Sequence, residues 1–284
     1  MRFLSLTFPA LCAAAAVSEC ENPTKRVEWR ELDDAARQQY TDAVVCLTAK
    51  LSRLGLNTTL YDDFPPVHTV ASFLPWHRYF VHVYEGALRR CGYKGVMPYW
   101  DWYLDADDTP KPTIWDPKTG FGVSRRRTFK DLFPAYLTTE YDPHCLARDW
   151  NDGSENVGNM LSENYNNEAV AKVQVFKDYD NYRQKLEAGP HGAIGGDMVP
   201  NTSPNGKSCV LVPCILEAIA NEDPKTRTME FVGYKTQDQF DGTKPPSASL
   251  DDILLMNGLA DDLRVEDLMS TQSSLLCYSY QVQS

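Results

Sequence analysis

The chain is short of positive charge and, after its first residues, of long hydrophobic runs. Its 284 residues include 28 Lys and Arg against 39 Asp and Glu, which gives a net charge of −11. An acidic surface of this kind repels polyanions, so we expect neither nucleic acid nor an anionic membrane as a partner. No segment beyond the N-terminus is apolar for long enough to cross a bilayer, so no membrane span is predicted.

The longest apolar run lies at the N-terminus. Met1-Arg2 is followed by mostly apolar residues as far as Val17, and Ala16-Val17-Ser18 supplies the small residues that a signal peptidase recognises. The pattern predicts a signal peptide over residues 1–18 and a secreted or secretory-pathway protein, and a buried N-terminal helix is the alternative interpretation. Residues 19–284 contain no linker, repeat or low-complexity run, so we expect one domain there.

Several catalytic motifs are also missing. The sequence contains no Gly-x-Ser-x-Gly, no His-Glu-x-x-His, no Cys-x-x-Cys and no phosphate-binding glycine loop. These absences argue against a serine hydrolase, a zinc protease, a dithiol redox protein and a nucleotide-binding enzyme.

Strand signals are few, so we predict a mainly α fold, a helix bundle with long irregular loops and few short strands. Residues 91–126 are expected to be irregular, with their tryptophans packed beside the core. The expected helices are 28–54, 73–90, one or two within 154–187, 249–256 behind a capping box at Ser249–Asp252, and 265–268. The best strand candidates are residues 209–212 and 277–282.

The cysteines agree with export. Of the eight cysteines, Cys12 lies in the expected leader, and the remaining seven favour disulfide pairing in an oxidising compartment, with a connectivity that the sequence leaves open. Asn57-Thr-Thr and Asn201-Thr-Ser are acceptor motifs for N-glycosylation.

Histidine is scarce, with five in the chain: His68, His77, His82, His144 and His191. His77 lies in the expected helix 73–90 among aromatic residues, where an imidazole is a good metal ligand, although imidazole alone does not select the metal. His82 follows five positions later, about 140° around the helix, and so cannot face the same ion. The alternative interpretations are a core histidine that bonds a carbonyl for His77, a loop residue for His68 and a structural turn residue for His191, whereas His82 and His144 are interpreted as structural.

The segment Phe73-Leu-Pro-Trp-His-Arg78 resembles the first copper-binding region of fungal tyrosinases and catechol oxidases. Further similarity runs in the family's order through most of the chain: Cys20-Glu-Asn-Pro23, Leu60-Tyr-Asp-Asp-Phe64, Pro143-His-Cys-Leu-Ala-Arg148, Leu186-Glu-Ala-Gly-Pro-His191, Gly195-Gly-Asp-Met198 and Leu276-Cys-Tyr-Ser-Tyr280. The resemblance implies a tyrosinase-like copper-binding domain over 19–284 that oxidises phenols or catechols with dioxygen. It also implies a role in pigment or aromatic secondary-metabolite biosynthesis.

The family holds each of two copper ions with three histidines. By resemblance, His68 and His77 match the first copper and His191 matches the second, whereas His144 lies in a signature that holds no metal. Residues 206–222 are atypical, because they stand where the family has a ligand-bearing helix. Our hypothesis is an unspliced intron with a skipped exon at this segment. The alternative function is a degenerate, non-catalytic secreted protein with weak or no copper binding.

Overall fold

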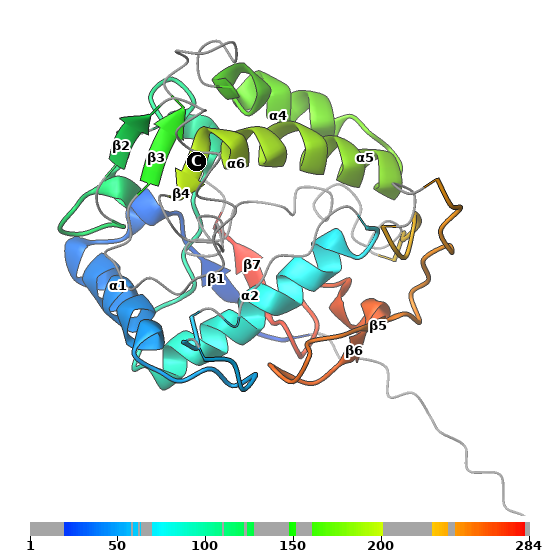
Figure 1. Cartoon of the computed structure of the whole chain (residues 1–284), viewed down its shortest axis with the longest axis horizontal. Coiled ribbons are helices and arrows are strands. Elements are labelled where there is room, and N and C mark those ends of the chain that lie inside the picture. Colours follow the sequence, from blue (N-terminus) through cyan, green and yellow to red (C-terminus); the bar gives the residue numbers. More distant parts are fainter. Residues whose placement is uncertain are drawn as a thin grey trace, which may run out of the picture.

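The computed structural model describes residues 20–57, 59–61, 63, 70–109, 111–121, 124–127, 148–151, 161–200, 229–237 and 242–281. Helices predominate and the strands are short, as predicted (Figure 1). The α-helices are α1 (Asp34–Thr48), α2 (Phe73–Arg90), α4 (Asn167–Gln174), α5 (Tyr179–Leu186) and α6 (Gly192–Asp197). Shorter helical turns are η1 (Trp29–Glu31), η2 (Trp102–Asp105), η3 (Thr113–Trp115), η5 (Leu161–Asn164), η6 (Glu187–His191) and η9 (Val265–Leu268).

The strands form three small sheets, none of which closes into a barrel within the described residues. The strands are β1 (Thr24–Arg26), β2 (Ser124–Arg127), β3 (Arg148–Asn151), β4 (Met198–Pro200), β5 (Ile253–Leu254), β6 (Leu263–Arg264) and β7 (Tyr278–Tyr280). β1 pairs in parallel with β7, β3 lies between β2 and β4, and β5 pairs antiparallel with β6. The strand β7 confirms the expectation for residues 277–282.

Helix α2 runs across the molecule and forms much of its core. Its bounds match the predicted helix 73–90. Aromatic and aliphatic side chains recur along it at helical spacing, so one broad side is buried and carries Phe73, Phe80, Tyr84 and Leu88, each at most 1% exposed. Ser72 occupies the N-cap position, but its side chain makes no capping hydrogen bond.

Helix α1 is shorter than the predicted helix 28–54. Its N-cap is Asp33, whose carboxylate accepts from the amide of Ala36 at 2.7 Å, which ends any N-terminal extension. Before it, Glu28 bridges to Tyr99 and residues 29–31 form η1. The spacing of apolar residues could not reveal that Glu28 pairs with Tyr99, because it indicates helical periodicity and carries no information on long-range pairing.

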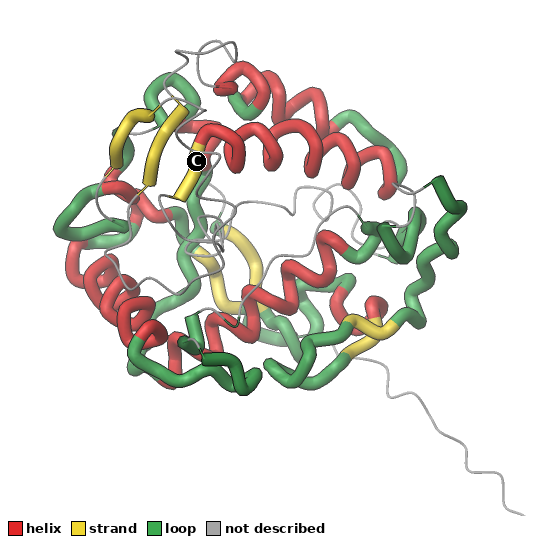
Figure 2. The backbone as a smooth tube through the Cα atoms, in the orientation of Figure 1, coloured by secondary structure: helices red, strands yellow, loops and turns green. Residues whose placement is uncertain are grey.

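The helical segment predicted within 154–187 consists of α4 and α5, which lie together on one side of the molecule. The chain continues from α5 through η6 into α6 (Figure 2), with a kink at Gly189, where the backbone is not helical. This segment contains Gly189, Pro190 and Gly192. The π-type turn η6 accommodates Pro190, which lacks the amide hydrogen that an α-helix needs.

The predicted helix 249–256 is wrong. The capping-box contacts do form: Asp252 accepts from the amide of Ser249 at 2.9 Å, and the Ser249 hydroxyl accepts from the amide of Asp251 at 3.2 Å. These two hydrogen bonds close a turn, not a helix. The chain then extends into β5, because Ile253 and Leu254 pair with β6. The predicted last helix at 265–268 is present as η9.

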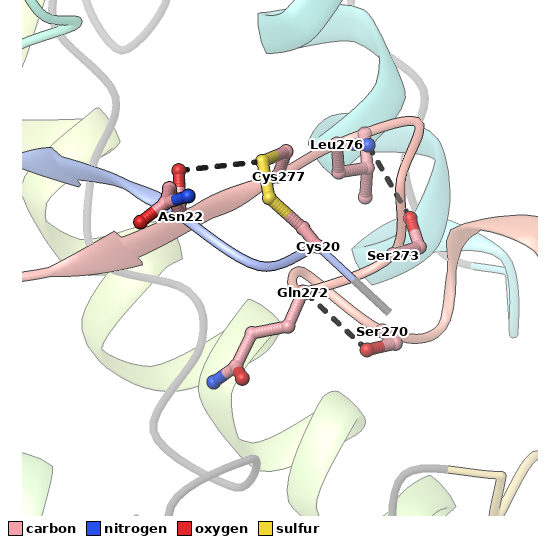
Figure 3. The surroundings of a disulfide bond; sticks show 7 residues. All are labelled: Cys20, Asn22, Ser270, Gln272, Ser273, Leu276 and Cys277. Carbon is pink, nitrogen blue, oxygen red and sulfur yellow. Dashed lines mark hydrogen bonds between the residues drawn. A yellow bond between two sulfur atoms is a disulfide. The ribbon is translucent and has the colours of Figure 1, made fainter. Parts of the chain in front are cut away.

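Tryptophans fill the irregular region after α2, as expected. Trp100 and Trp102 are 2% and 3% exposed, and Trp115 meets Trp100 edge-on with ring centroids 5.0 Å apart. Two disulfides, Cys20–Cys277 and Cys46–Cys91, tie the fold together. The first joins Cys20, which lies shortly before β1, to Cys277, which directly precedes β7 (Figure 3).

Among the described helices, none is long and apolar enough to span a membrane. Several sequence-based expectations lie outside the described residues: the signal peptide 1–18, His68, His144, the strand 209–212, Asn201 and the atypical segment 206–222. Asn57, the other glycosylation candidate, is exposed.

Candidate metal centre

His77 lies in the second turn of α2, and its ring orientation is fixed by the helix itself. Its Nδ1 lies 2.7 Å from the carbonyl oxygen of Phe73, one turn earlier. A carbonyl only accepts hydrogen bonds, so Nδ1 carries the proton and Nε2 presents the lone pair in the neutral ring. The rings of Phe73 and Trp76 lie 4.6 and 5.1 Å from the imidazole. The result is an oriented imidazole in aromatic surroundings.

His191 is the last residue of η6, where the chain passes from α5 into α6. The backbone at Gly189 departs from helical geometry, with φ −93° and ψ −109°, and Pro190 follows it. Turns of the π type are frequent at functional sites, because the extra residue re-aims the neighbouring side chains. His191 is partly buried.

The ring of Phe73 lies against both imidazoles. It is 4.6 Å from the His77 ring and meets the His191 ring edge-on at 5.2 Å, while its own side chain is fully buried. Two histidines that are far apart in the sequence therefore share one aromatic neighbour.

Hydrogen bonds hold the helices that carry these histidines in place. The Tyr179 hydroxyl at the start of α5 donates to the carbonyl of Ala71 at 2.6 Å, just before α2 begins. On another side of α2, Arg78 donates to the carbonyls of Leu268 and Met269 at 3.0 and 2.6 Å. Each contact spans more than a hundred residues of sequence, so α2 is fixed by partners that its own sequence does not reveal.

His82 lies on a different side of α2, as its five-residue spacing from His77 predicts. Its ring stacks on Tyr79 with centroids 6.3 Å apart, and it lines a cavity that also contacts β1 and β7. Burial lowers the pKa of His82, so the ring is neutral at pH 7. It shares none of the Phe73 contacts of the other two histidines.

The chemistry of His77 fits a copper ligand. Metal-bound histidines usually donate their second ring nitrogen to a carbonyl or carboxylate, which fixes the tautomer and the ring orientation. The bond to the Phe73 carbonyl does this. Within the described ranges no group of three or more His, Cys, Asp or Glu side chains is placed to hold a metal ion. His68, the remaining candidate, lies outside those ranges.

The sequence-based argument missed Phe73 as a shared neighbour and Tyr179 as a helix anchor. Phe73 is part of the motif that identified α2, but its contact with His191 joins two distant segments. No local pattern signals such a contact. Tyr179 opens a helix with a capping aspartate, Asp178, and that local signal says nothing of Ala71.

A family model described as the common central domain of tyrosinase matches residues 37–206. The chain belongs to the tyrosinase family. The matched range includes α2, α5 and α6, and also the three expected ligands His68, His77 and His191. The tyrosinase family is a family of dicopper enzymes, which agrees with the donor chemistry of His77.

Two relatives that the chain covers over most of their length support the assignment to the tyrosinase family. The tyrosinase-like protein phomQ1' of Diaporthe leptostromiformis is 33% identical over 306 residues, covering 93% of this chain and 81% of the relative. Tyrosinase ustQ of Aspergillus flavus is 33% identical over 293 residues, covering 92% of this chain and 80% of the relative.

The tyrosinase-type fold is also found among solved structures. A polyphenol oxidase from Thermothelomyces thermophila superposes with a TM-score of 0.73 at 23% sequence identity, covering 92% of this chain and 89% of that chain. The similarity confirms the predicted fold class: mainly α, with long loops and few short strands.

Proposed function

We propose that this tyrosinase-family chain is a secreted copper oxidoreductase that oxidises phenols or catechols with dioxygen. The product would be a pigment precursor or an aromatic secondary metabolite. The observation that carries the proposal is the His77 imidazole, whose Nδ1 is engaged by the Phe73 carbonyl so that Nε2 is presented for coordination. The contact of Phe73 with His191 supports a second ligand position nearby.

In this proposal His68 and His77 hold the first copper and His191 contributes to the second. Bound copper would supply the one-electron chemistry that lets a phenol react with dioxygen. The chain's own part is to orient the imidazoles and to surround them with apolar walls. Phe73 and Trp76 provide such walls at His77, and their burial excludes water from that side of the ring.

One observation favours a second candidate function, a non-catalytic tyrosinase-like protein. The chain has five histidines, fewer than the six ligands of the family, and three of the five match ligand positions. Each missing ligand weakens metal binding, because the ion then keeps water in that position. The two candidates differ in the copper content that the purified chain should show.

Metal analysis tests the proposal directly. We expect the full chain, reconstituted with copper, to bind the metal and to consume oxygen when a catechol is added. The variant His77→Gln should lose most of the copper, whereas the matched variant His82→Gln on the same helix should keep it. Oxygen uptake that persists in His77→Gln would overturn the ligand assignment. A copper-free, inactive wild-type chain would favour the non-catalytic candidate.

The transcript decides the status of the atypical segment 206–222. If the hypothesis is right, sequencing the messenger RNA should show a different coding sequence there, without the retained intron and with the skipped exon. A chain with the restored junction should then bind more copper than the chain as written. If the messenger encodes these residues as written, the intron hypothesis is wrong and the divergence is genuine.

A further inference from the structure

A cavity of about 280 Å³ lies between α2 and the β1–β7 sheet, on the side of α2 that carries His82. On α2 its lining residues follow one stripe at helical spacing, and the facing wall comes from β1 and the segment that leads into β7. The lining residues are Thr24, Arg26, His82, Glu85, Gly86, Arg89, Met97, Leu275, Leu276, Cys277 and Tyr278.

Two guanidinium groups and one carboxylate meet at this cavity. Arg89 Nη2 donates to Glu85 Oε1 at 2.6 Å, and Arg26 Nη2 lies 3.9 Å from Glu85 Oε2. Both arginines therefore contact the same carboxylate. Among the residues that line the cavity, with His82 neutral, positive charges outnumber negative charges by one. The whole chain carries a net charge of −11, so this local surplus contrasts with the rest of the molecule.

The side chains of Arg26 and Arg89 differ in their exposure to solvent. The Arg89 side chain is 47% exposed, whereas that of Arg26 is 2% exposed. The guanidinium of Arg26 lies over the Tyr278 ring, with Cζ 3.4 Å from the ring centroid, which fixes its position. An anion that enters from solvent meets Arg89 first, and the immobilised Arg26 lies further in.

The remaining wall is largely apolar. Met97 is fully buried, and Leu276 and Tyr278 are 5% and 3% exposed. An apolar wall beside fixed cations is the usual composition of a site for a small amphiphilic molecule, in which few polar groups set orientation and the apolar surface supplies area.

We propose that this cavity binds a small carboxylate with an apolar body, such as an aromatic acid. The carboxylate would lie between Arg26 and Arg89, since the planar guanidinium matches a carboxylate in two parallel hydrogen bonds. The neutral His82 ring would donate a further hydrogen bond, and the apolar body would contact Met97 and Leu276. The site lies apart from His77, and the inference does not depend on the proposed oxidase activity.

The probe is benzoate, titrated by calorimetry into the full-length chain at low salt. We expect Arg89→Gln to weaken binding by about tenfold or more, because it removes a charge-assisted contact at an exposed position that folding tolerates. Arg90→Gln is the matched control: it removes an exposed arginine from the next position of α2, outside the cavity. The affinity of Arg90→Gln for benzoate should equal that of the wild type. The neutral amide benzamide should bind far more weakly than benzoate.

Benzoate could also reach the candidate metal centre, and His77→Gln separates the two sites. Binding at the cavity persists in that variant and shifts the imidazole NMR signals of His82. Equal affinity in the wild type and Arg89→Gln would overturn the proposal. So would benzamide binding as tightly as benzoate, loss of binding in His77→Gln, or the absence of binding to the wild type.

Discussion

At the scale of single residues, Asp101 has a buried carboxyl group, and burial disfavours its charged form. It is 4% exposed, and burial raises its pKa to about 7, with Glu28 nearby adding to the effect and a Tyr103 hydrogen bond opposing it. Arg30 pairs with Glu28 and Asp105 in the same cluster. The folded protein therefore takes up a proton at Asp101 at a pH where the unfolded chain has already lost it.

The consequence is a loss of stability as pH rises from about 4 to about 7, because the folded state binds more protons than the unfolded state across that window. We expect Asp101→Asn to flatten this dependence in urea unfolding measured at pH 5 and pH 8. Asp116→Asn is the control. Hydrogen bonds from Thr119 and Lys118 lower the pKa of Asp116, so its effect falls at lower pH. An unchanged slope in Asp101→Asn would contradict the expectation.

Phe73 is the residue through which the two matched histidines meet. Phe73→Leu keeps an apolar side chain but removes the ring faced by His77 and His191. We expect a loss of about 1–2 kcal/mol in the free energy of unfolding, from packing and aromatic contacts. Copper content should fall more than in Phe80→Leu, a matched change in the same helix, since the Phe80 ring lies 6.4 Å from His77. Equal copper in the two variants would show that the ring has no special role.

At the scale of elements, helix starts offer a matched pair. The Asp33 carboxylate caps α1, whereas the Ser72 side chain makes no capping bond at α2. We expect Asp33→Ala to lower the free energy of unfolding by about 1 kcal/mol, and Ser72→Ala to change it by less than about 0.5 kcal/mol. Denaturant titration measures both. A larger loss of unfolding free energy in Ser72→Ala than in Asp33→Ala would show that the Ser72 side chain does stabilise the start of α2.

The elements also show how far the sequence determines the fold. Helix α2 was predictable to the residue because its apolar spacing and its aromatic motif agree. The limits of α1 and the turn at Ser249–Asp252 were not, since pairing with Tyr99 and with β6 decided them. The pairing of His77 with Phe73 follows from helical spacing, whereas the position of His191 depends on the turn at Gly189 and Pro190.

At the scale of the whole molecule, the disulfide Cys20–Cys277 closes a much longer loop than Cys46–Cys91, with separations of 257 and 45 residues. In the chain-entropy account a longer loop restricts the unfolded state more. We expect the double variant Cys20→Ser, Cys277→Ser to lose about 5 kcal/mol in the free energy of unfolding. By the same relation it should lose about 1.5 kcal/mol more than Cys46→Ser, Cys91→Ser. Thermal unfolding of both double variants measures the two losses. A larger loss from removing Cys46–Cys91 than from removing Cys20–Cys277 would contradict this account.

The same cross-link gives the described chain the topology of a ring. Cys20 and Cys277 lie near the two ends of the described residues, so nearly all of the fold is contained between them. A tensile force applied at the two ends would pass through the sulfur atoms and leave the enclosed helices without load. A single proteolytic nick inside the ring would likewise leave one covalent molecule, which separates into fragments on a gel only after reduction.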